Sequence, residues 1–408
     1  MTFFMRYKKK IFGILFETGL ICVLLLSSVQ NTNAQENLNL HAQAYALMDG
    51  DSGRVLAEKA GNDAMANAST TKILTCIVAL ENGNVDDTIV FSKNAASQPE
   101  VHLGLKENVS ISLRDALLCL MLESYNDCAV AIAEHIGGSC EGFAELLNNK
   151  AKELGCTNTY FITPNGLDRE DENSFHHSSA IDLCLMMKYC CFESEKAEEF
   201  RQICQTKEHS FSASDNRVYQ IYNRNKLLFE NGRIVAGKTG YTSKAGYCYV
   251  AAFEEKEKKY CICVLASGWP NHKNFRWEDT NSLLQYGDAN FVPYVFEKPD
   301  SLKGYVLKLN GYEGAPTLEQ WKTPTEISYE ILGSDKKGLV ENTEILKKSV
   351  FFRQDIDDSL DLDECIGNIY EYADEEEMNL YRIVSKSEIH KWDYLPLLWA
   401  ILNKFFEL

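Results

Sequence analysis

The spacing of hydrophobic and polar residues predicts strands at both ends of a segment that begins near residue 44 and ends near residue 266. Apolar runs at 44–48 and 54–58 flank a cluster of turn residues, which is typical of a β-hairpin. Three further runs, at 234–240, 246–253 and 260–266, are separated by glycine-containing or charged turns. We therefore expect these segments to form β-strands.

Helical spacing dominates the chain between these strands. Apolar residues recur with a helical period over residues 72–80, 113–122, 127–136 and 143–154. Ser112 with Asp115, and Ser179 with Asp182, are spaced as helix capping boxes, and Gly137-Gly138 is a typical helix stop. This order predicts an α/β (α+β) fold, in which helices flank an antiparallel sheet without repeated βαβ units.

The pattern changes after Phe291. Short alternating runs among acidic turns predict a small, mainly β domain at residues 292–385, after a larger domain at 36–291. We assign residues 386–408 to a C-terminal amphipathic helix because several apolar residues fall on one helical face: Leu395, Leu398, Trp399, Leu402, Phe405 and Phe406. Pro396 and the short length argue against a span, so we expect contact with a membrane surface. Packing against the protein itself is an equally open alternative.

The N-terminus has the pattern of a secretory signal peptide. Basic residues at positions 6–10 precede a largely apolar stretch at 11–28, and small residues at 32–34 suit a cleavage site. An uncleaved anchor is the alternative, which Glu17 and the short apolar core disfavour. We expect residues 1–34 to be removed and the protein to be exported to the outer face of the cytoplasmic membrane.

Charge and cysteine content narrow the classes of function. The chain has 41 Lys and Arg against 59 Asp and Glu, a net charge of −18. Residues 1–34 contribute +3, so the mature chain is near −18 − 3 = −21. Such acidity argues against nucleic-acid binding. The 14 cysteines show no zinc-ligand spacing, and we expect most of them to be small core residues. A disulfide is possible but cannot be assigned, and no metal or cofactor is expected.

Candidate chemistry begins at Ser69. If residues 72–80 are helical, Ser69 and Lys72 share one face, one turn apart. Serine needs a base within hydrogen-bond reach, and a lysine whose environment keeps it neutral can serve as that base. Ser334 and Lys337 have the same spacing, but they lie in a charged turn without downstream partners.

Two later elements complete a possible site. Ser124-Tyr125-Asn126 lies between two apolar helices, where a turn can direct side chains into a cleft. The triplets at 92–94 and 214–216 have the same spacing, but polar surroundings make them weaker candidates. Lys238-Thr239-Gly240 lies in a predicted strand, and Gly240 would allow a ligand backbone to lie close to its edge. The cation and hydroxyl suit a substrate that ends in a carboxylate.

The ordered set resembles the signature of the penicillin-binding protein and serine β-lactamase superfamily: Ser-x-x-Lys, Ser-x-Asn and Lys-Thr-Gly. The closer likeness is to the low-molecular-weight D-alanyl-D-alanine carboxypeptidases. It extends from about residue 42 to Phe291 and includes matches at 48–49, 53–56, 68–72, 126–127, 165–167, 176–180, 223–228, 238–243 and 283–287. Tyr125 replaces a residue that is small in many relatives, and residues 292–385 match only loosely.

The resemblance implies a role for each matching residue. Ser69 would attack the carbonyl between the last two D-alanines of a peptidoglycan stem pentapeptide, Lys72 would take its proton, and Ser124 would relay a proton between Lys72 and Lys238. The substrate would be held by Asn126 at its amide, by Thr239, Thr242 and Arg224 at its carboxylate, by Gly240 at its backbone, and by the backbone N–H groups of Ser69 and Tyr241 at its oxyanion. β-Lactam antibiotics would act as inhibitors by trapping Ser69.

Two other functions use the same superfamily fold. A β-lactamase needs a deacylating base, for which Glu170 and Glu172 are the candidates, but the Glu-x-x-x-Asn motif is absent. We interpret both as surface acids. A non-enzymatic sensor of β-lactams or muropeptides would form a stable adduct without turnover. His176 and His177 invite a triad with Ser69, but their place before a capping box favours a structural role.

Overall fold

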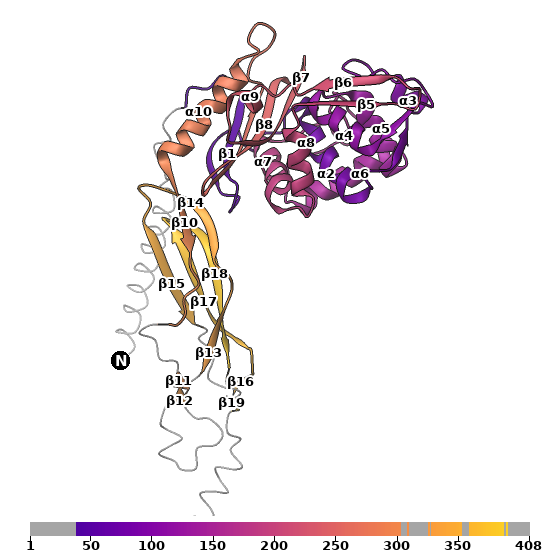
Figure 1. The fold of residues 1–408 in the computed structure, drawn as a ribbon. Coiled ribbons are helices and arrows are strands. Elements are labelled where there is room, and N and C mark those ends of the chain that lie inside the picture. Colours follow the sequence, from indigo (N-terminus) through magenta and orange to yellow (C-terminus); the bar gives the residue numbers. More distant parts are fainter. Residues whose placement is uncertain are drawn as a thin grey trace, which may run out of the picture. The chain divides into compact units, whose positions relative to one another are not determined.

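The computed structural model describes residues 38–302, 308–309, 325–326, 328–352, 359–386 and 389–390 (Figure 1). The predicted signal peptide at 1–34 and the apolar face predicted after residue 392 lie outside these residues. Within the described part, no helix is both long enough and apolar enough to cross a bilayer.

A five-stranded antiparallel sheet forms the centre of the larger part of the fold. Its strands lie in the order β2 (Val55–Lys59), β1 (Ala44–Asp49), β9 (Lys258–Leu265), β8 (Gly246–Glu255) and β7 (Ile234–Thr242). Ala44 pairs with Leu265, so the N-terminal hairpin joins the sheet beside β9, although about 200 residues separate the two in sequence. The pairing sets the register in which the apolar residues of these strands are buried together. All of these strands were predicted from the sequence.

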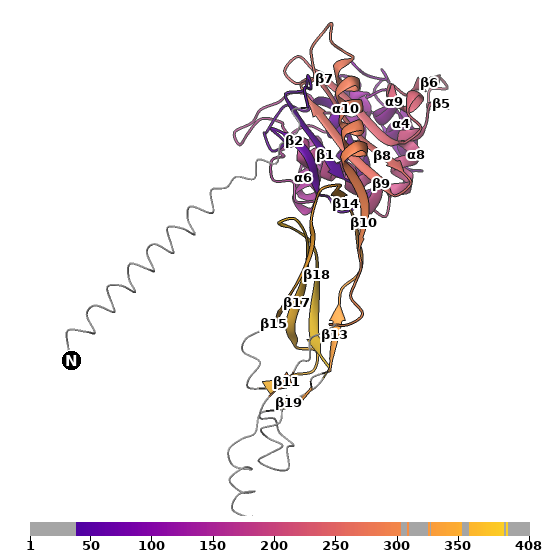
Figure 2. The same ribbon diagram turned by 90° about the vertical axis from the view of Figure 1, so that its left-hand side faces the viewer.

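Helices cover both faces of the sheet (Figure 2). On one face α7 packs against β1, β8 and β9, with the other helices beyond it, and on the opposite face lies α10. The carboxylate of Asp279 in α10 accepts hydrogen bonds from the N–H groups of His41 and Ala42 and from Ser267 Oγ. The helices are α2 (Lys72–Asn82), α3 (Lys93–Ala96), α4 (Leu113–Leu122), α5 (Asn126–Gly137), α6 (Cys140–Glu153), α7 (Ala180–Lys188), α8 (Ala197–Gln205), α9 (Leu227–Glu230) and α10 (Phe275–Asn290).

Helix α2 lies at the centre of the core. Every residue from Lys72 to Leu80 is buried, as expected for a helix that is apolar on all sides. It follows directly from the 3₁₀ helix η1 (Ala68–Thr71), and the π-helical segment η2 (Tyr189–Glu193) extends α7. Because α2 is enclosed by other helices, its first turn is a rigid base for catalytic side chains.

Helix ends follow the predicted capping signals. Ser112 Oγ accepts a hydrogen bond from the Asp115 N–H at the start of α4, and Ser179 Oγ accepts one from Asp182 at the start of α7. Helix α5 ends at Gly137, and Gly138, which follows it, has a φ of 72° that suits glycine. Helix α6 begins three residues before its predicted start, because Ser139 caps it by accepting from the Gly142 N–H.

Several elements were not expected from the sequence. These are helices α8 and α10 and the hairpin strands β3 (Thr88–Val90), β4 (Ser110–Ser112) and β5 (Glu208–Ser212), the last of which pairs with the predicted strand β6 (Val218–Tyr222). Helix α10 buries Asp279 and Thr280 alongside its apolar residues, so its inward face lacks the hydrophobic period that would have revealed it.

The residues after Phe291 are mainly β, as predicted. Their apolar centre is a buried cluster of Leu302, Ile331, Ile366, Ile369, Tyr381 and Ile383. The strands are β10 (Phe291–Phe296), β11 (Lys308–Leu309), β12 (Thr325–Glu326), β13 (Tyr329–Leu332), β14 (Lys336–Glu341), β15 (Leu346–Phe352), β16 (Ser359–Leu360), β17 (Cys365–Ala373), β18 (Glu376–Ser385) and β19 (Ile389–His390). Strands β13, β18, β17 and β15 form a four-stranded sheet.

One boundary prediction is wrong. The interval 386–408 was assigned to a helix, yet Ile389 and His390 form strand β19, paired with β16. The first residues of that interval lack the apolar helical period, and pairing with Ser359 and Leu360 satisfies their backbone groups instead.

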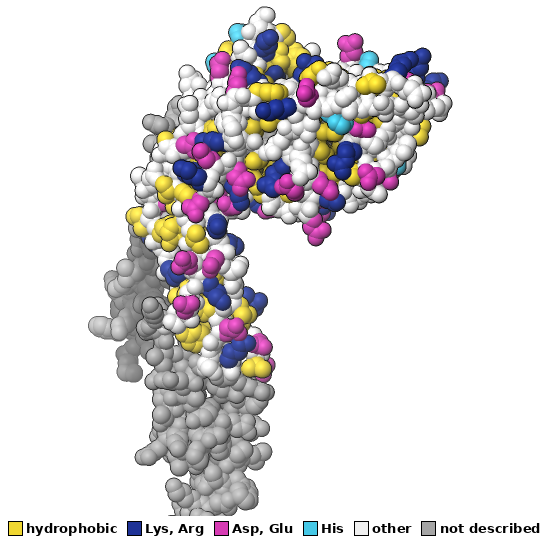
Figure 3. Space-filling view, in the orientation of Figure 1, with side chains coloured by type: hydrophobic (Ala, Val, Ile, Leu, Met, Phe, Trp, Pro, Cys, Tyr) yellow, Lys and Arg dark blue, Asp and Glu magenta, His cyan; other side chains and the backbone are white. Residues whose placement is uncertain are grey.

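On the face shown in Figure 3, acidic and basic side chains are interspersed, so the negative net charge does not collect in one patch there.

Candidate active site

Ser69 stands in η1, immediately before the buried helix α2. Ala68, which precedes it, has a φ of 49°, a left-handed conformation that costs energy for a residue with a side chain and is common at functional turns. Lys72 is the first residue of α2 and is fully buried. Its Nζ lies 2.8 Å from Ser69 Oγ, so the predicted nucleophile and base are in hydrogen-bond contact.

The surroundings of Lys72 prepare it to accept a proton. Its Nζ also contacts two acceptors, Asn126 Oδ1 at 2.9 Å and the carbonyl oxygen of Asn165 at 2.7 Å. Burial lowers the pKa of Lys72 well below its usual value, and the charge of Lys238 lowers it further. A neutral amine has two N–H bonds and one lone pair. With both N–H groups donated to these acceptors, the lone pair faces the hydroxyl of Ser69.

Ser124 and Lys238 form a second hydroxyl–amine pair. Ser124 lies in the turn between α4 and α5 with a φ of 68°, and Lys238 is a buried residue of β7. Lys238 Nζ lies 2.9 Å from Ser124 Oγ and donates to the carbonyl oxygen of Thr239 at 3.0 Å. Burial lowers the pKa of Lys238 to about 7, with a smaller contribution from the charge of Arg276.

The competing serines lie elsewhere. Ser214 Oγ accepts from the Ser110 N–H at 2.9 Å, at the edge of the β3–β4 hairpin, and Ser92 caps α3. Ser334 belongs to the β-rich region, where its carbonyl oxygen accepts from Asn379. Of the serines considered, Ser124 is the one that contacts Lys238.

Strand β7 passes directly behind the nucleophile. A Cβ atom at Gly240 would lie 3.0 Å from the Asn67 carbonyl oxygen and 3.1 Å from the Ser69 nitrogen. Real Cβ atoms seldom come so close to other atoms. Because glycine has no Cβ, strand β7 can approach the Ser69 turn at this position. Tyr241 follows with an exposed side chain, and the Thr242 hydroxyl accepts from the Ala245 N–H at 3.0 Å while its own proton stays available to donate.

Two arginines differ in their suitability for binding a carboxylate. Arg224, the candidate from the sequence, is mostly exposed and forms a 2.7 Å ion pair with the buried Glu123, which neutralises its charge. Arg276 in α10 was not anticipated. Its guanidinium lies 4.7 Å from the ring centres of both Tyr247 and Trp277, and its Nε has no hydrogen-bond partner. None of the described acidic residues forms an ion pair with Arg276.

Arg276 also belongs electrostatically to the site, because its charge contributes to the lowered pKa of Lys238. A half-buried cation without a counter-ion favours the binding of an anion. The sequence signal, an arginine flanked by Phe275 and Trp277, was too short to distinguish it from the other arginines in the chain.

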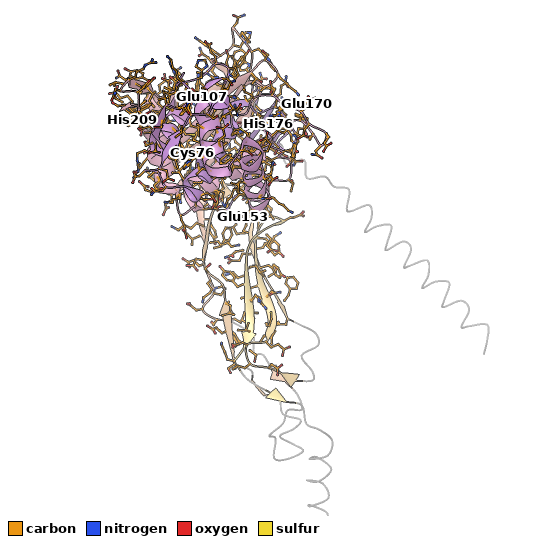
Figure 4. The ribbon with its side chains drawn as sticks, turned by 90° about the vertical axis from the view of Figure 1, so that its right-hand side faces the viewer. Cys76, Glu107, Glu153, Glu170, His176 and His209 are labelled. Atoms are coloured by element: carbon orange, nitrogen blue, oxygen red, sulfur yellow. The ribbon has the colours of Figure 1, made fainter. Side chains whose placement is uncertain are left out.

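His176 has a structural role. Its Nδ1 accepts from the Ile162 N–H at 3.0 Å, so the proton resides on Nε2, which donates to Thr71 Oγ1 at 2.8 Å. Burial, with smaller contributions from His177 and Lys72, lowers its pKa to about 3. His176 therefore supports the turn of the nucleophile as a neutral ring and makes no contact with Ser69 Oγ. It lies within the helical body in Figure 4.

The acids considered for deacylation lie on the surface. Glu170 is 71% exposed and forms an ion pair with Lys244 at 3.0 Å, and it lies at the periphery in Figure 4. Glu172 is also exposed. Among the described residues, no cluster of His, Cys, Asp and Glu side chains is arranged to hold a metal ion.

Comparison with known proteins supports the same assignment. A family model described as D-alanyl-D-alanine carboxypeptidase (peptidase family S11) matches residues 30–268. D-alanyl-D-alanine carboxypeptidase DacF of Bacillus subtilis is 28% identical over 94% of this chain and 96% of its own length. DacA of Haemophilus influenzae is 34% identical over 62% of this chain and 63% of its own length.

Solved structures share the fold. D-alanyl-D-alanine carboxypeptidase DacD from Francisella tularensis aligns with a TM-score of 0.68 at 21% identity, over 90% of this chain and 100% of its own. The D-alanyl-D-alanine carboxypeptidase of Mycobacterium tuberculosis aligns with a TM-score of 0.56 at 31% identity, over 61% of this chain and 91% of its own. Since the family model matches more than half of the sequence, this chain belongs to the D-alanyl-D-alanine carboxypeptidase family, peptidase family S11.

Proposed function

We propose that this protein is a serine D,D-carboxypeptidase that removes the terminal D-alanine from peptidoglycan stem peptides through an acyl-enzyme on Ser69. The observation that carries the proposal is the 2.8 Å contact between Ser69 Oγ and a fully buried Lys72 whose two N–H groups already have acceptors. Membership of the family supports the substrate class.

Acylation follows from this geometry. Ser69 Oγ attacks the carbonyl carbon between the last two D-alanines, and its proton passes to Lys72. The carbonyl becomes an oxyanion, for which the backbone N–H groups of Ser69 and Tyr241 are the candidate donors. Each such donor typically contributes about 3 kcal/mol. The C–N bond then breaks, and the departing D-alanine nitrogen takes the proton that Lys72 accepted, relayed through Ser124, so Lys72 is neutral again for deacylation; Lys238 holds Ser124 through its 2.9 Å contact.

Deacylation uses the same groups in reverse. Water attacks the ester of Ser69 and gives a proton to Lys72. Lys72 passes that proton to Ser69 Oγ as the ester bond breaks, so Ser69 leaves as a hydroxyl. No separate acid is needed, which agrees with the exposed positions of Glu170 and Glu172. Both D-alanine and the shortened peptide are then released.

The terminal carboxylate of the substrate would be bound by hydroxyls and a cation. Thr239 and Thr242 supply the hydroxyls, as the sequence suggested. We assign the cation to Arg276 in place of Arg224, because no acid in the described part of the chain pairs with Arg276, whereas Arg224 is neutralised by Glu123. We assign the substrate amide to Asn126: its Nδ2 donates one N–H to the carbonyl oxygen of Pro99 at 3.3 Å, which leaves its second N–H for the substrate.

The direct test is release of D-alanine from a stem pentapeptide by the mature protein. We expect turnover that is absent in Ser69→Ala. A labelled penicillin should form an adduct that dissociates slowly, whereas rapid penicillin turnover would identify a β-lactamase instead. A permanent adduct without any peptide turnover would identify a sensor.

We further propose that the protein is exported and acts at the outer face of the cytoplasmic membrane. The basic and apolar pattern of residues 1–34 supports export, and the apolar face after residue 392 supports contact with a membrane surface through the C-terminal segment. Fractionation of cells that express the full chain, compared with a chain that ends at residue 390, tests both points. Equal release of the two forms into the soluble fraction would refute membrane attachment.

A further inference from the structure

A cavity of about 480 Å³ lies next to the catalytic residues. It is open to solvent and is lined by α3, by the turn between α5 and α6, and by the loop at residues 162–169. This volume is within the range of pockets that bind small ligands. None of the catalytic steps above uses it.

Asn165 and Gln98 separate this cavity from the catalytic groups. Asn165 lines the cavity, and its carbonyl oxygen accepts from Lys72 Nζ at 2.7 Å and lies 3.4 Å from Ser69 Oγ. Its Nδ2 donates to Gln98 Oε1 at 3.3 Å, and Gln98 lines the cavity as well. Asn165 therefore contacts the catalytic lysine and lines the cavity as well, which places the cavity within reach of a side chain one position from the acylated residue.

The cavity carries charges of both signs that are not paired with each other. Glu134 is half-buried and accepts one hydrogen bond from Asn94 Nδ2 at 2.8 Å, and Glu141 lies at the start of α6. Arg169 lies on the loop side. Among the described residues, none forms an ion pair with Glu134 or with Arg169. An acid and a base in one pocket, both without a counter-ion, complement a ligand group that bears an ammonium and a carboxylate together.

We propose that this cavity binds the side chain of the stem-peptide residue just before the acylated D-alanine, when that side chain ends in both an ammonium and a carboxylate. Glu134 receives the ammonium and Arg169 the carboxylate. The inference rests on the proposed carboxypeptidase function and names the class of stem peptide that the enzyme prefers. Diaminopimelate is a residue of this chemistry, whereas lysine supplies the ammonium alone.

Three acetylated tripeptides that end in D-Ala-D-Ala test the assignment. Their first residue is meso-diaminopimelate, lysine or Nε-acetyl-lysine. We expect kcat/KM to fall in that order, by about tenfold at each step, which corresponds to roughly 1.4 kcal/mol. Arg169→Gln should abolish the preference for diaminopimelate over lysine. Glu134→Gln, which keeps an acceptor for Asn94, should abolish the preference for lysine over acetyl-lysine.

Matched substitutions outside the cavity provide the controls. Arg217→Gln and Glu208→Gln remove exposed charges from the β5–β6 hairpin and should leave both preferences intact. Equal kcat/KM values for the three peptides in the wild type would overturn the inference while leaving the carboxypeptidase function in place. If Arg169→Gln and Arg217→Gln changed the preferences equally, that result would also overturn the inference. Absence of D-alanine release from all three peptides would refute the proposed function, and the inference with it.

Discussion

Replacement of Lys238 by methionine should abolish activity and at the same time stabilise the fold at pH 6. Lys238 is buried, and its pKa falls from 10.5 to about 7. At about 1.4 kcal/mol per pKa unit, this fall corresponds to roughly 5 kcal/mol of unfavourable free energy for holding the charged amine in the folded state. Methionine has a similar volume and no charge to desolvate.

Part of that gain is offset by lost contacts. Lys238 donates to Ser124 and to the Thr239 carbonyl oxygen, and each hydrogen bond contributes about 1 kcal/mol. The net stabilisation should therefore be about 3 kcal/mol at pH 6, which corresponds to a rise in Tm of roughly 5–10 °C.

The pH dependence has a defined sign. Between pH 7 and 10.5 the unfolded state keeps the proton on Lys238 and the folded state releases it, so the wild type gains stability as pH rises. The advantage of Lys238→Met should be complete below pH 7 and should diminish toward pH 10.

Thermal unfolding followed by circular dichroism at pH 6 and pH 9 measures the effect. Lys93→Met, which removes an exposed lysine from α3, is the control and should leave Tm nearly unchanged. A Lys238→Met variant that is less stable than the wild type at pH 6 would show that the lysine is held by favourable interactions, and the reasoning from burial would be wrong.

Three other substitutions have defined expectations. Arg276→Gln should raise KM by about tenfold for a peptide that ends in a free carboxylate, and it should leave acylation by a thioester that lacks the carboxylate nearly unchanged. An equal loss of activity toward both substrates would contradict a carboxylate-binding role. Thr71→Val should lower the free energy of unfolding by about 1–3 kcal/mol in urea titrations, because the buried His176 Nε2–H loses its acceptor, and no change would refute the structural role of that histidine. Gly240→Ala should slow penicillin acylation by about 100-fold, because the added methyl pushes on the Ser69 turn, and an unchanged acylation rate would show that the turn tolerates the displacement.

The sequence predicts the elements in which apolar residues keep the spacing of a helix or of a strand throughout. Helix α2 is apolar on all sides and β8 is buried along most of its length, so both are recognisable without tertiary information. Helix α10 is different because Asp279 and Thr280 are buried: Asp279 accepts from the N–H groups of His41 and Ala42 and from the hydroxyl of Ser267, and Thr280 donates to the Arg276 carbonyl oxygen of its own helix. Polar residues that are buried for such reasons break the apolar period.

The candidate catalytic side chains can be proposed from spacing and order, whereas their supporting groups cannot. Ser69 and Lys72 lie one helical turn apart, where η1 leads into α2, so their contact follows from local geometry. The carbonyl oxygen of Asn165 is a backbone group that every residue carries, and only the folded loop places it 2.7 Å from Lys72 Nζ. Arg276 and Arg224 are indistinguishable by residue type, and their ion-pair partners separate them only in three dimensions.

Peptide mapping after incubation with labelled penicillin shows directly whether Ser69 is the nucleophile. We expect one stoichiometric label on the hydroxyl of Ser69, lost in Ser69→Ala and formed much more slowly in Lys72→Met. Label on another residue, or undiminished labelling of Ser69 without Lys72, would contradict the assignment of Ser69 and Lys72 as nucleophile and base.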